Sequence, residues 1–451
     1  MSISPVIKFL RSKDELTTAE ILLDTLRKYS ETLEHYDDLG NGYLEIKAFR
    51  KAEQLALQCL PLVDTDDQRC SVYANLAKIY NSLNEPHQAL DCLSKIESLG
   101  FVTSDLLLER TFSLFLLNRK TEAEQILRDM LADTSLTEDM HQRVRFNLGV
   151  YEMKRQNFAA GIHNIQVIGK QLSIWPTPQL SGKFWQGGIR PGETIVILAE
   201  GGIGDEIINV RFCKMLEQYG MTPLWYRQKS HVAPIIERMG IKVVTDPAQF
   251  PREFLWTYSM SLPLYLNAKP EKLWNGAYIS ATQESKDKFS WIQNGNGKKK
   301  VGIRWGGNPR YEHDLHRTVD FTALYATLKP FGFELYSLQR DADLEVLADY
   351  PDIVDLSEQL VTYDDTMGVI SNLDFVISSC TSVAHVSAAM GAKTFVLVPI
   401  SAYYIWEYTD DATSPWYGDN VTLCRQRTHK SWAEPLAELA KYVDATIKAT
   451  L

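Results

Sequence analysis

An aspartate ends a glycine-rich turn near the middle of the chain. Residues 200–206 read EGGIGDE, between an apolar run expected to form a strand and a run expected to form a helix. Gly201, Gly202 and Gly204 would let the backbone turn tightly and approach a ligand. The spacing matches neither GxGxxG nor GxxxxGK[ST]. Asp205 is therefore a candidate proton acceptor, although spacing alone favours a helix N-cap.

A second candidate is a hydroxyl-rich turn in residues 373–391, LDFVISSCTSVAHVSAAMG. An apolar strand is expected to run into it, and a small-residue helix is expected to follow. Hydroxyls and free N–H groups at a helix start suit a diphosphate and require no metal. His385, one turn into the helix, is either a functional group or a satisfied structural one. The turn residues that we expect to contact a donor are Ser379, Cys380, Thr381 and Ser382.

Polar residues follow two further predicted strands. Arg304 and Asn308 lie in the segment GIRWGGNP, and Gln339 and Arg340 end the segment SLQR. Arg317, in the polar loop DLHR, could offer a planar pair of donors to phosphate. We expect these five side chains to contribute to the same ligand site.

Two other patterns have more than one interpretation. Asp341 and Asp343 formally match a metal-binding DxD, but acidic residues at a helix start also stabilise the helix dipole, which is the interpretation we favour. The aromatic loops at 403–406 and 414–417 could stack a base or sugar, or simply pack. We therefore predict no metal ligands.

Repeats occupy the first part of the chain. The pattern Tyr36-x-x-Leu39-Gly40-x-x-Tyr43 recurs 37 residues later, and weaker copies follow at helical spacing. The pattern resembles the tetratricopeptide repeat, a helix–turn–helix unit. Because one such unit cannot bury its apolar face alone, we predict a stacked helical array over 15–170. It would form a groove for a peptide or partner, or serve only as a spacer or self-association surface.

The apolar period changes near residue 171. A Pro-, Gly- and Trp-containing linker is predicted over 171–192, and strands then alternate with helices over 193–282 and over 298–430. This alternation is typical of parallel α/β sheets, which bind ligands at the carboxyl ends of their strands. A last helix is expected within 431–451, and it could cross back to the first lobe.

Composition narrows the class of protein. The chain has 451 residues, a net charge of −10 and six cysteines without a CxxC pair. These values exclude a disordered chain or a disulfide scaffold and argue against a zinc site or extensive nucleic-acid binding. No apolar run approaches the roughly 18 residues of a membrane span. The charged N-terminus does not read as a signal peptide, so we expect a cytoplasmic protein.

Taken in order, EGGIGDEI, MSLP, VGIRWGGNP, HR at 316–317, SLQR, CTSVAH and SPWY resemble segments of bacterial tetratricopeptide-repeat glycosyltransferases. The catalytic part of that family resembles heptosyltransferases, and its architecture resembles protein O-GlcNAc transferases. The resemblance implies a GT-B fold: two Rossmann-like lobes, with the nucleotide-sugar donor on the C-terminal one and the acceptor facing the N-terminal one. It also implies that no metal or cofactor is required.

The resemblance also assigns roles to residues. Asp205 matches a proposed general base, and Arg317 matches a basic position in a phosphate-facing loop. Thr381 and His385 match a donor-side Asp-Thr-x-x-x-His segment, in which Cys380 replaces the aspartate.

We therefore predict a metal-independent glycosyltransferase of hexosyl or heptosyl type. It would move a sugar from a nucleoside-diphosphate sugar to a hydroxyl of a protein or glycan docked with help from the repeats; modified DNA is a less favoured acceptor. Two alternatives stay open. One is a catalytically inactive binding or assembly protein, which the loss of an acid at Cys380 favours. The other is a nucleotide-sugar epimerase.

Overall fold

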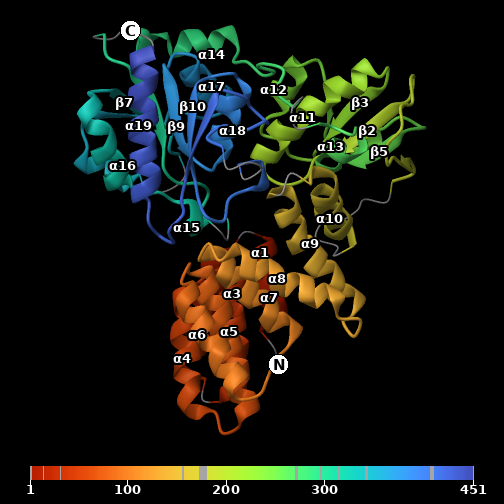
Figure 1. The fold of residues 1–451 in the computed structure, drawn as a ribbon, viewed down its shortest axis with the longest axis vertical. Coiled ribbons are helices and arrows are strands. Elements are labelled where there is room, and N and C mark those ends of the chain that lie inside the picture. The colour runs from red at the N-terminus through yellow and green to blue at the C-terminus, as the bar shows by residue number, and fades with distance from the viewer. Residues whose placement is uncertain are drawn as a thin grey trace. The chain divides into compact units, whose positions relative to one another are not determined.

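The computed structural model describes residues 3–13, 15–30, 32–154, 157–171, 180–269, 273–294, 297–309, 311, 314–340, 344–406 and 411–449 (Figure 1). The chain divides into two compact units. One comprises Met1–Met140 and Arg310–His316, and the other comprises His141–Pro309 and Arg317–Leu451.

The first unit is helical, and its described residues contain no strand. Paired helices are joined by tight turns in which Lys47, Asn84 and Asn118 adopt positive φ angles. Ala52, Ala89 and Ala123 are fully buried where the paired helices pack, which preserves the predicted repeat spacing. The helices are α1 (Ser4–Ser12), α2 (Leu16–Arg27), α3 (Leu33–Glu45), α4 (Phe49–Cys59), α5 (Asp66–Ser82), α6 (Pro86–Ser98), α7 (Ser104–Leu116) and α8 (Lys120–Ala132).

Threonine caps begin three of these helices. The side chains of Thr32, Thr65 and Thr103 accept backbone N–H groups at the starts of α3, α5 and α7. Such caps satisfy N–H groups that the first helical turn leaves without partners. Periodic caps and small residues together explain why this part folds as stacked helix pairs.

Two further helices belong to the second unit rather than to the array. They are α9 (Glu138–Lys154) and α10 (Phe158–Gln171). Met153 and Ile162 are buried in the same core as the first lobe, and α10 packs on α13 (Leu262–Tyr265). The boundary between the two units therefore falls at residue 140, whereas the repeat pattern was expected to extend as one array to 170.

The first α/β lobe contains a parallel sheet with the order β1-β5-β2-β3-β4. Its strands are β1 (Lys183–Phe184), β2 (Thr194–Leu198), β3 (Thr222–Tyr226), β4 (Lys242–Val244) and β5 (Leu255–Tyr258), and its main helices are α11 (Ile203–Gln218) and α12 (Ala233–Arg238). Strand β1 lies inside the predicted linker 171–192, of which 172–179 lies outside the described residues. It pairs with β5, so this segment completes an edge of the sheet.

The second lobe contains a parallel sheet with the order β11-β10-β9-β6-β7-β8. Its strands are β6 (Lys300–Arg304), β7 (Glu334–Ser337), β8 (Ile353–Asp355), β9 (Phe375–Ser379), β10 (Thr394–Val398) and β11 (Val421–Arg425). Its helices include α14 (Gln283–Lys288), α15 (Asp314–Arg317), α16 (Phe321–Leu328), α17 (Tyr363–Ile370), α18 (Ser382–Ala389) and α19 (Ala433–Ala449). The predicted fold class, a helical array followed by two Rossmann-like lobes, is confirmed.

The C-terminal helix α19 packs on the second lobe. Leu436, Leu439 and Val443 are buried in one cluster with Val301 and Ile303 of β6, and α19 also packs on β10, β11 and α16. The expectation that this helix could cross back to the first lobe is therefore wrong. The apolar stripe of α19 is satisfied by its own lobe, whose outer sheet face it covers.

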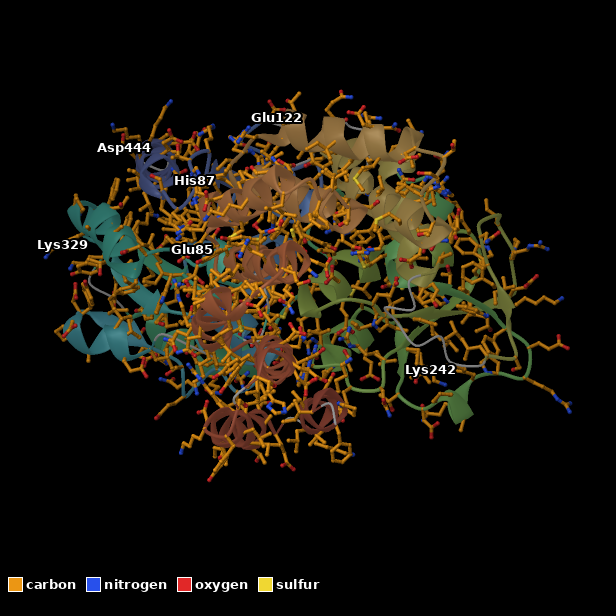
Figure 2. All side chains as sticks on the ribbon, turned by 90° about the horizontal axis from the view of Figure 1, so that it is seen from below. Glu85, His87, Glu122, Lys242, Lys329 and Asp444 are labelled. Atoms are coloured by element: carbon orange, nitrogen blue, oxygen red, sulfur yellow. The ribbon has the colours of Figure 1, made fainter. Side chains whose placement is uncertain are left out.

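Charged side chains point away from both units, as Glu122, Lys242 and Lys329 illustrate (Figure 2). Surface ion pairs such as Arg119–Glu122, at 2.6 Å, stabilise a fold only slightly. None of the described helices combines the length and apolar character needed to cross a membrane.

Candidate functional site

The two lobes meet through the helices that follow β2 and β9. The first turn of α11 packs against α18, and both helices start at carboxyl ends of parallel strands (Figure 1). A Cβ atom added at Gly204 would lie 2.9 Å from Cδ2 of His385. This approach brings the glycine-rich turn and the hydroxyl-rich turn, which are far apart in sequence, into one region.

Asp205 occupies the third position of α11 and is partly buried. Its Oδ2 accepts the backbone N–H of Gly202 at 2.7 Å, so the side chain caps its own helix. Its Oδ1 accepts the hydroxyl of Tyr403 from the other lobe. Burial raises the pKa of Asp205, while these two hydrogen bonds and the charge of Arg227 oppose that rise. A carboxyl group with a raised pKa is suited to accepting a proton near neutral pH.

Two neighbouring carboxylates hold the glycine-rich turn. Glu200 is buried, and its Oε2 accepts the N–H of Met260 at 3.2 Å, which ties β2 to the segment MSLP. Glu206 accepts the indole N–H of Trp225 at 3.1 Å and lies 3.4 Å from Nη1 of Arg227. Burial raises the pKa of Glu206. Because protein donors already engage both carboxylates, Asp205 is the acid of this turn that faces the second lobe.

The hydroxyl-rich turn leads into the N-terminus of α18. Ser378 donates its hydroxyl to the carbonyl of Ser379 at 2.8 Å, and its Oγ lies 3.1 Å from Oγ1 of Thr381. Oγ of Ser382 lies 2.8 Å from the hydroxyl of Tyr363. Oγ of Ser379 is fully buried and has no hydrogen-bond partner among the described atoms. Buried polar atoms are normally paired, so this turn has an unused donor beside a helix start.

Arg317 lies against this turn, as its loop position suggested. Its Nη1 donates to the carbonyl of Cys380 at 2.9 Å. The thiol of Cys380 is buried, and burial raises its pKa; the N–H groups of Tyr403 and of the Trp406 indole oppose the rise. The guanidinium thus places a permanent positive charge beside the start of α18.

The other predicted donor-side residues divide into two groups. Arg304 donates Nε and Nη1 to carbonyl oxygens of the loops after β6 and β7, at 3.0 and 2.9 Å. Gln339 accepts the N–H of Gly306 at 3.2 Å. These two buried side chains join neighbouring strand ends, whereas the side chains of Asn308 and Arg340 are exposed.

His385 is enclosed by aromatic rings. It is 4 % exposed, its ring is stacked on Trp406 with the centroids 4.6 Å apart, and its Nδ1 lies 3.1 Å from the hydroxyl of Tyr417. Burial, with the charges of Arg211 and Arg317, lowers the pKa of His385 to about 3. The imidazole is therefore neutral near pH 7 and can offer a hydrogen bond but no charge.

Sequence reasoning missed the buried Arg211. This side chain of α11 donates Nη1 to the carbonyls of Trp416 at 2.6 Å and Leu273 at 3.2 Å, and Nη2 to the hydroxyl of Tyr278 at 2.7 Å. It therefore links the first lobe to the SPWY segment of the second. The available signal was a charged residue on the apolar face of a helix, together with the aromatic residues around 416.

Metal-binding side chains do not gather in the part of the chain that the structure describes. No group of three or more His, Cys, Asp and Glu residues there has suitable geometry. The DxD residues Asp341 and Asp343 lie outside the described residues.

The helical unit has a groove of its own between α3, α4 and α5, with a volume of about 330 Å³. Its walls combine apolar side chains with three carboxylates, Glu34, Asp37 and Asp67, and the described lining residues include no Lys, Arg or His. Asp37 accepts the side-chain amide of Asn75 at 3.2 Å. The groove therefore favours a cationic ligand with some apolar surface.

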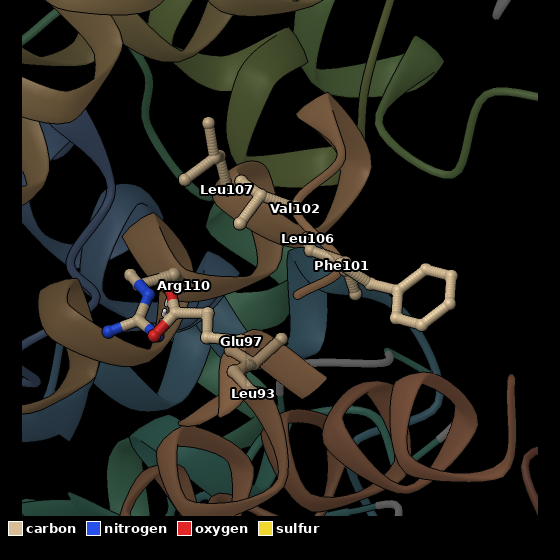
Figure 3. A pocket seen from close by; sticks show the side chains of 7 residues that line it. All are labelled: Leu93, Glu97, Phe101, Val102, Leu106, Leu107 and Arg110. Carbon is tan, nitrogen blue, oxygen red and sulfur yellow. Dashed lines mark ion pairs between the residues drawn. The ribbon is translucent and has the colours of Figure 1, made fainter. Parts of the chain in front are cut away.

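A second hollow in this unit is far smaller. It lies beside the Glu97–Arg110 ion pair, whose atoms are 2.6 Å apart, and Leu93 and Phe101 help to line it (Figure 3). Its volume of about 10 Å³ corresponds to about one water molecule. It is therefore too small to be a ligand site.

No protein-family model matches the chain, and no curated protein matches it. Solved structures that resemble it include glycosyl transferase family 9 from Veillonella parvula (10 % identity, TM-score 0.39, 58 % of this chain and 91 % of that one). E. coli ADP-heptose lps heptosyltransferase II has 11 % identity and a TM-score of 0.37, with 56 % and 98 % covered. A mutant Thermobaculum terrenum O-GlcNAc transferase has 11 % identity and a TM-score of 0.32, with 96 % and 93 % covered. Because all three TM-scores are below 0.5, function must be argued from the site itself.

We predict that His385 does not titrate between about pH 5 and pH 8, because burial lowers its pKa far below the ordinary value. Ring-labelled histidine NMR of the full chain measures this, and His385→Asn identifies the signal. The exposed His87 serves as the titrating control. Unfolding frees the imidazole to an ordinary pKa of about 6.5, so stability from this residue should fall as pH drops below that value. A His385 signal that moves with the His87 signal would contradict the prediction.

Proposed function

We propose that this protein is a glycosyltransferase that moves a sugar from a nucleoside-diphosphate sugar to a hydroxyl group of a protein or glycan. One observation carries the proposal. A carboxylate after β2, Asp205, lies in the same compact unit as an anion-receptive strand-to-helix turn after β9, and Tyr403 joins the two lobes there. Proton removal and diphosphate departure need these two kinds of group on opposite sides of the reacting carbon.

The donor diphosphate is assigned to the start of α18. The helix N-terminus offers N–H groups and a positive dipole end, and Ser379 has an unpaired buried hydroxyl there. Thr381 and Ser382 add hydroxyls, and Arg317 adds a fixed positive charge. These groups can offset the negative charge that grows on the leaving diphosphate, so we propose that the transfer needs no metal.

The acceptor is assigned to the side of Asp205. The acceptor oxygen attacks the anomeric carbon while the bond from that carbon to the diphosphate oxygen breaks, and the bonding electrons leave with the diphosphate. The acceptor proton passes to Oδ1 of Asp205, because Oδ2 is engaged by the N–H of Gly202. The raised pKa of Asp205 makes this carboxylate a better proton acceptor than an ordinary surface aspartate.

The groove of the helical unit is proposed to dock a polypeptide acceptor. A cationic, partly apolar segment complements its three carboxylates and its apolar walls. Such docking would raise the local concentration of the acceptor hydroxyl without any new contact at the reacting atoms.

The first test is Asp205→Asn. Asparagine keeps the size of the side chain and an oxygen for the Gly202 N–H, so stability should fall little. It removes the proton acceptor, so the transfer rate should fall about 10²- to 10⁴-fold. The affinity for nucleoside diphosphate, measured by calorimetry, should persist. Asp352→Asn, which neutralises an exposed aspartate, is the control. Transfer within a few-fold of the parent would show that Asp205 is only a helix cap.

The second test removes two hydroxyls of the turn in the double variant Thr381→Val and Ser382→Ala. A hydrogen bond to a charged group contributes about 1.5–3 kcal/mol, so Kd for a nucleoside diphosphate should rise at least about 10-fold. Thermal shift and calorimetry measure this. Thr327→Val with Ser371→Ala removes hydroxyls from other helices of the same lobe. Equal affinities of the two double variants would place the donor elsewhere.

The third test concerns the groove. Asp37→Asn with Asp67→Asn should weaken binding of a lysine-rich peptide to the full chain by roughly 2- to 5-fold, since exposed pairs contribute about 0.2–1 kcal/mol each. Fluorescence anisotropy at low and high salt measures this, and the salt dependence should also decrease. Asp91→Asn with Glu122→Gln removes the same charge outside the groove lining. A matching loss in that control would mean that only net charge matters.

Donor binding that survives without transfer to any acceptor would favour a different function. The chain would then be a binding or assembly protein, the alternative that Cys380 suggests.

A further inference from the structure

Tyr403 belongs to the loop between β10 and the short 3-10 helix η8 (Tyr404–Trp406) of the second lobe. Its hydroxyl donates to Oδ1 of Asp205 in the first lobe, across 198 positions of sequence. The other oxygen, Oδ2, already accepts the N–H of Gly202. Tyr403 therefore engages the oxygen that remains for an acceptor hydroxyl.

The surroundings hold the phenol of Tyr403 in this direction. Its ring packs at a tilt on Tyr404, with the centroids 4.5 Å apart, and its carbonyl accepts the N–H of Trp406 at 3.0 Å. Its own N–H faces the sulfur of Cys380. Burial and the nearby Asp205 keep the pKa of Tyr403 well above its ordinary value, so the phenol remains a protonated donor.

We propose that Tyr403 is a positioning residue that takes the place of the acceptor hydroxyl on Asp205 while the site is empty and is displaced when the acceptor binds. The inference rests on the proposed function and deepens it. A phenol O–H and an alcohol O–H donate the same kind of hydrogen bond, so one can replace the other on the same carboxylate oxygen. While Tyr403 is bound it orients the carboxylate, favours its charged form and links the lobes.

Other charged or titratable groups also act on Asp205. Arg227, after β3, lowers its pKa, and the groups of Tyr404 and Cys380 interact with it from the second lobe. Tyr403→Phe leaves all three in place and keeps the ring. A change in the titration of Asp205 in that variant therefore reports the lost phenol hydroxyl.

The chain contains a matched control. Tyr325 donates its hydroxyl to Oδ2 of Asp352 at 2.7 Å, an exposed tyrosine–aspartate pair outside the site. Tyr325→Phe removes the same kind of hydrogen bond without touching Asp205.

The first measurement is the carboxyl titration of Asp205 in the full chain, followed by NMR of ¹³C-labelled aspartate and assigned with Asp205→Asn. Tyr403→Phe should move the midpoint to higher pH, because a hydrogen bond that favours the charged form is lost. Tyr325→Phe should leave it unchanged. An unchanged midpoint in Tyr403→Phe would overturn the inference, whatever the activity of the protein.

The second measurement is transfer kinetics. Removing a competing hydroxyl should lower the acceptor KM roughly 2- to 10-fold, the effect of one ordinary hydrogen bond, and the acid limb of kcat/KM should move to higher pH. A merely structural tyrosine would instead raise KM and leave the acid limb in place, and that result would also overturn the inference. A chain that binds donor but transfers to nothing contradicts the proposed function, and the carboxyl titration still decides whether Tyr403 controls Asp205.

Discussion

The first turn of α11 and the helix α18 approach so closely that a Cβ atom at position 204 would lie 2.9 Å from the ring of His385. Glycine at this position is therefore a condition for the contact between the lobes. The hydrogen bond from Tyr403 to Asp205 and the hydrogen bonds of Arg211 to the second lobe both depend on that approach. Without it, the two strand-to-helix turns would belong to separate lobes, and no single site would contain both a carboxylate and an anion-binding turn.

Burial gives the two sides of this site opposite chemical characters. On the first lobe, it raises the pKa of Asp205, whose carboxyl group thereby becomes a stronger base. On the second lobe, it lowers the pKa of His385, so the positive charge facing the hydroxyl-rich turn comes from Arg317 and the dipole of α18. An imidazolium at position 385 would compete with Arg317 for the same anion and repel it. Burial of the ring against Trp406 avoids that conflict.

Local patterns predict the elements of this site but not its contacts. A buried apolar run followed by glycines or hydroxyls correctly indicates the strand-to-helix turns after β2 and β9, and the spacing of small residues such as Ala52 and Ala89 indicates the helix pairs. Strand β5 (Leu255–Tyr258) escapes because four residues carry little periodicity, and its pairing with β2 and β1 is long-range. The partner of Asp205 lies 198 residues away, so no local pattern encodes it.

The position of Asp205 shows how one side chain can serve both folding and chemistry. Its bond to the N–H of Gly202 satisfies a donor that the first turn of α11 would otherwise leave without a partner, and it also fixes the rotamer of the side chain. The direction of the second carboxylate oxygen is then set by the helix itself. Only the group that meets this oxygen must come from elsewhere, and here it comes from the opposite lobe. A reactive carboxylate oriented by its own helix cap needs only a correct approach of the two lobes to meet its partner.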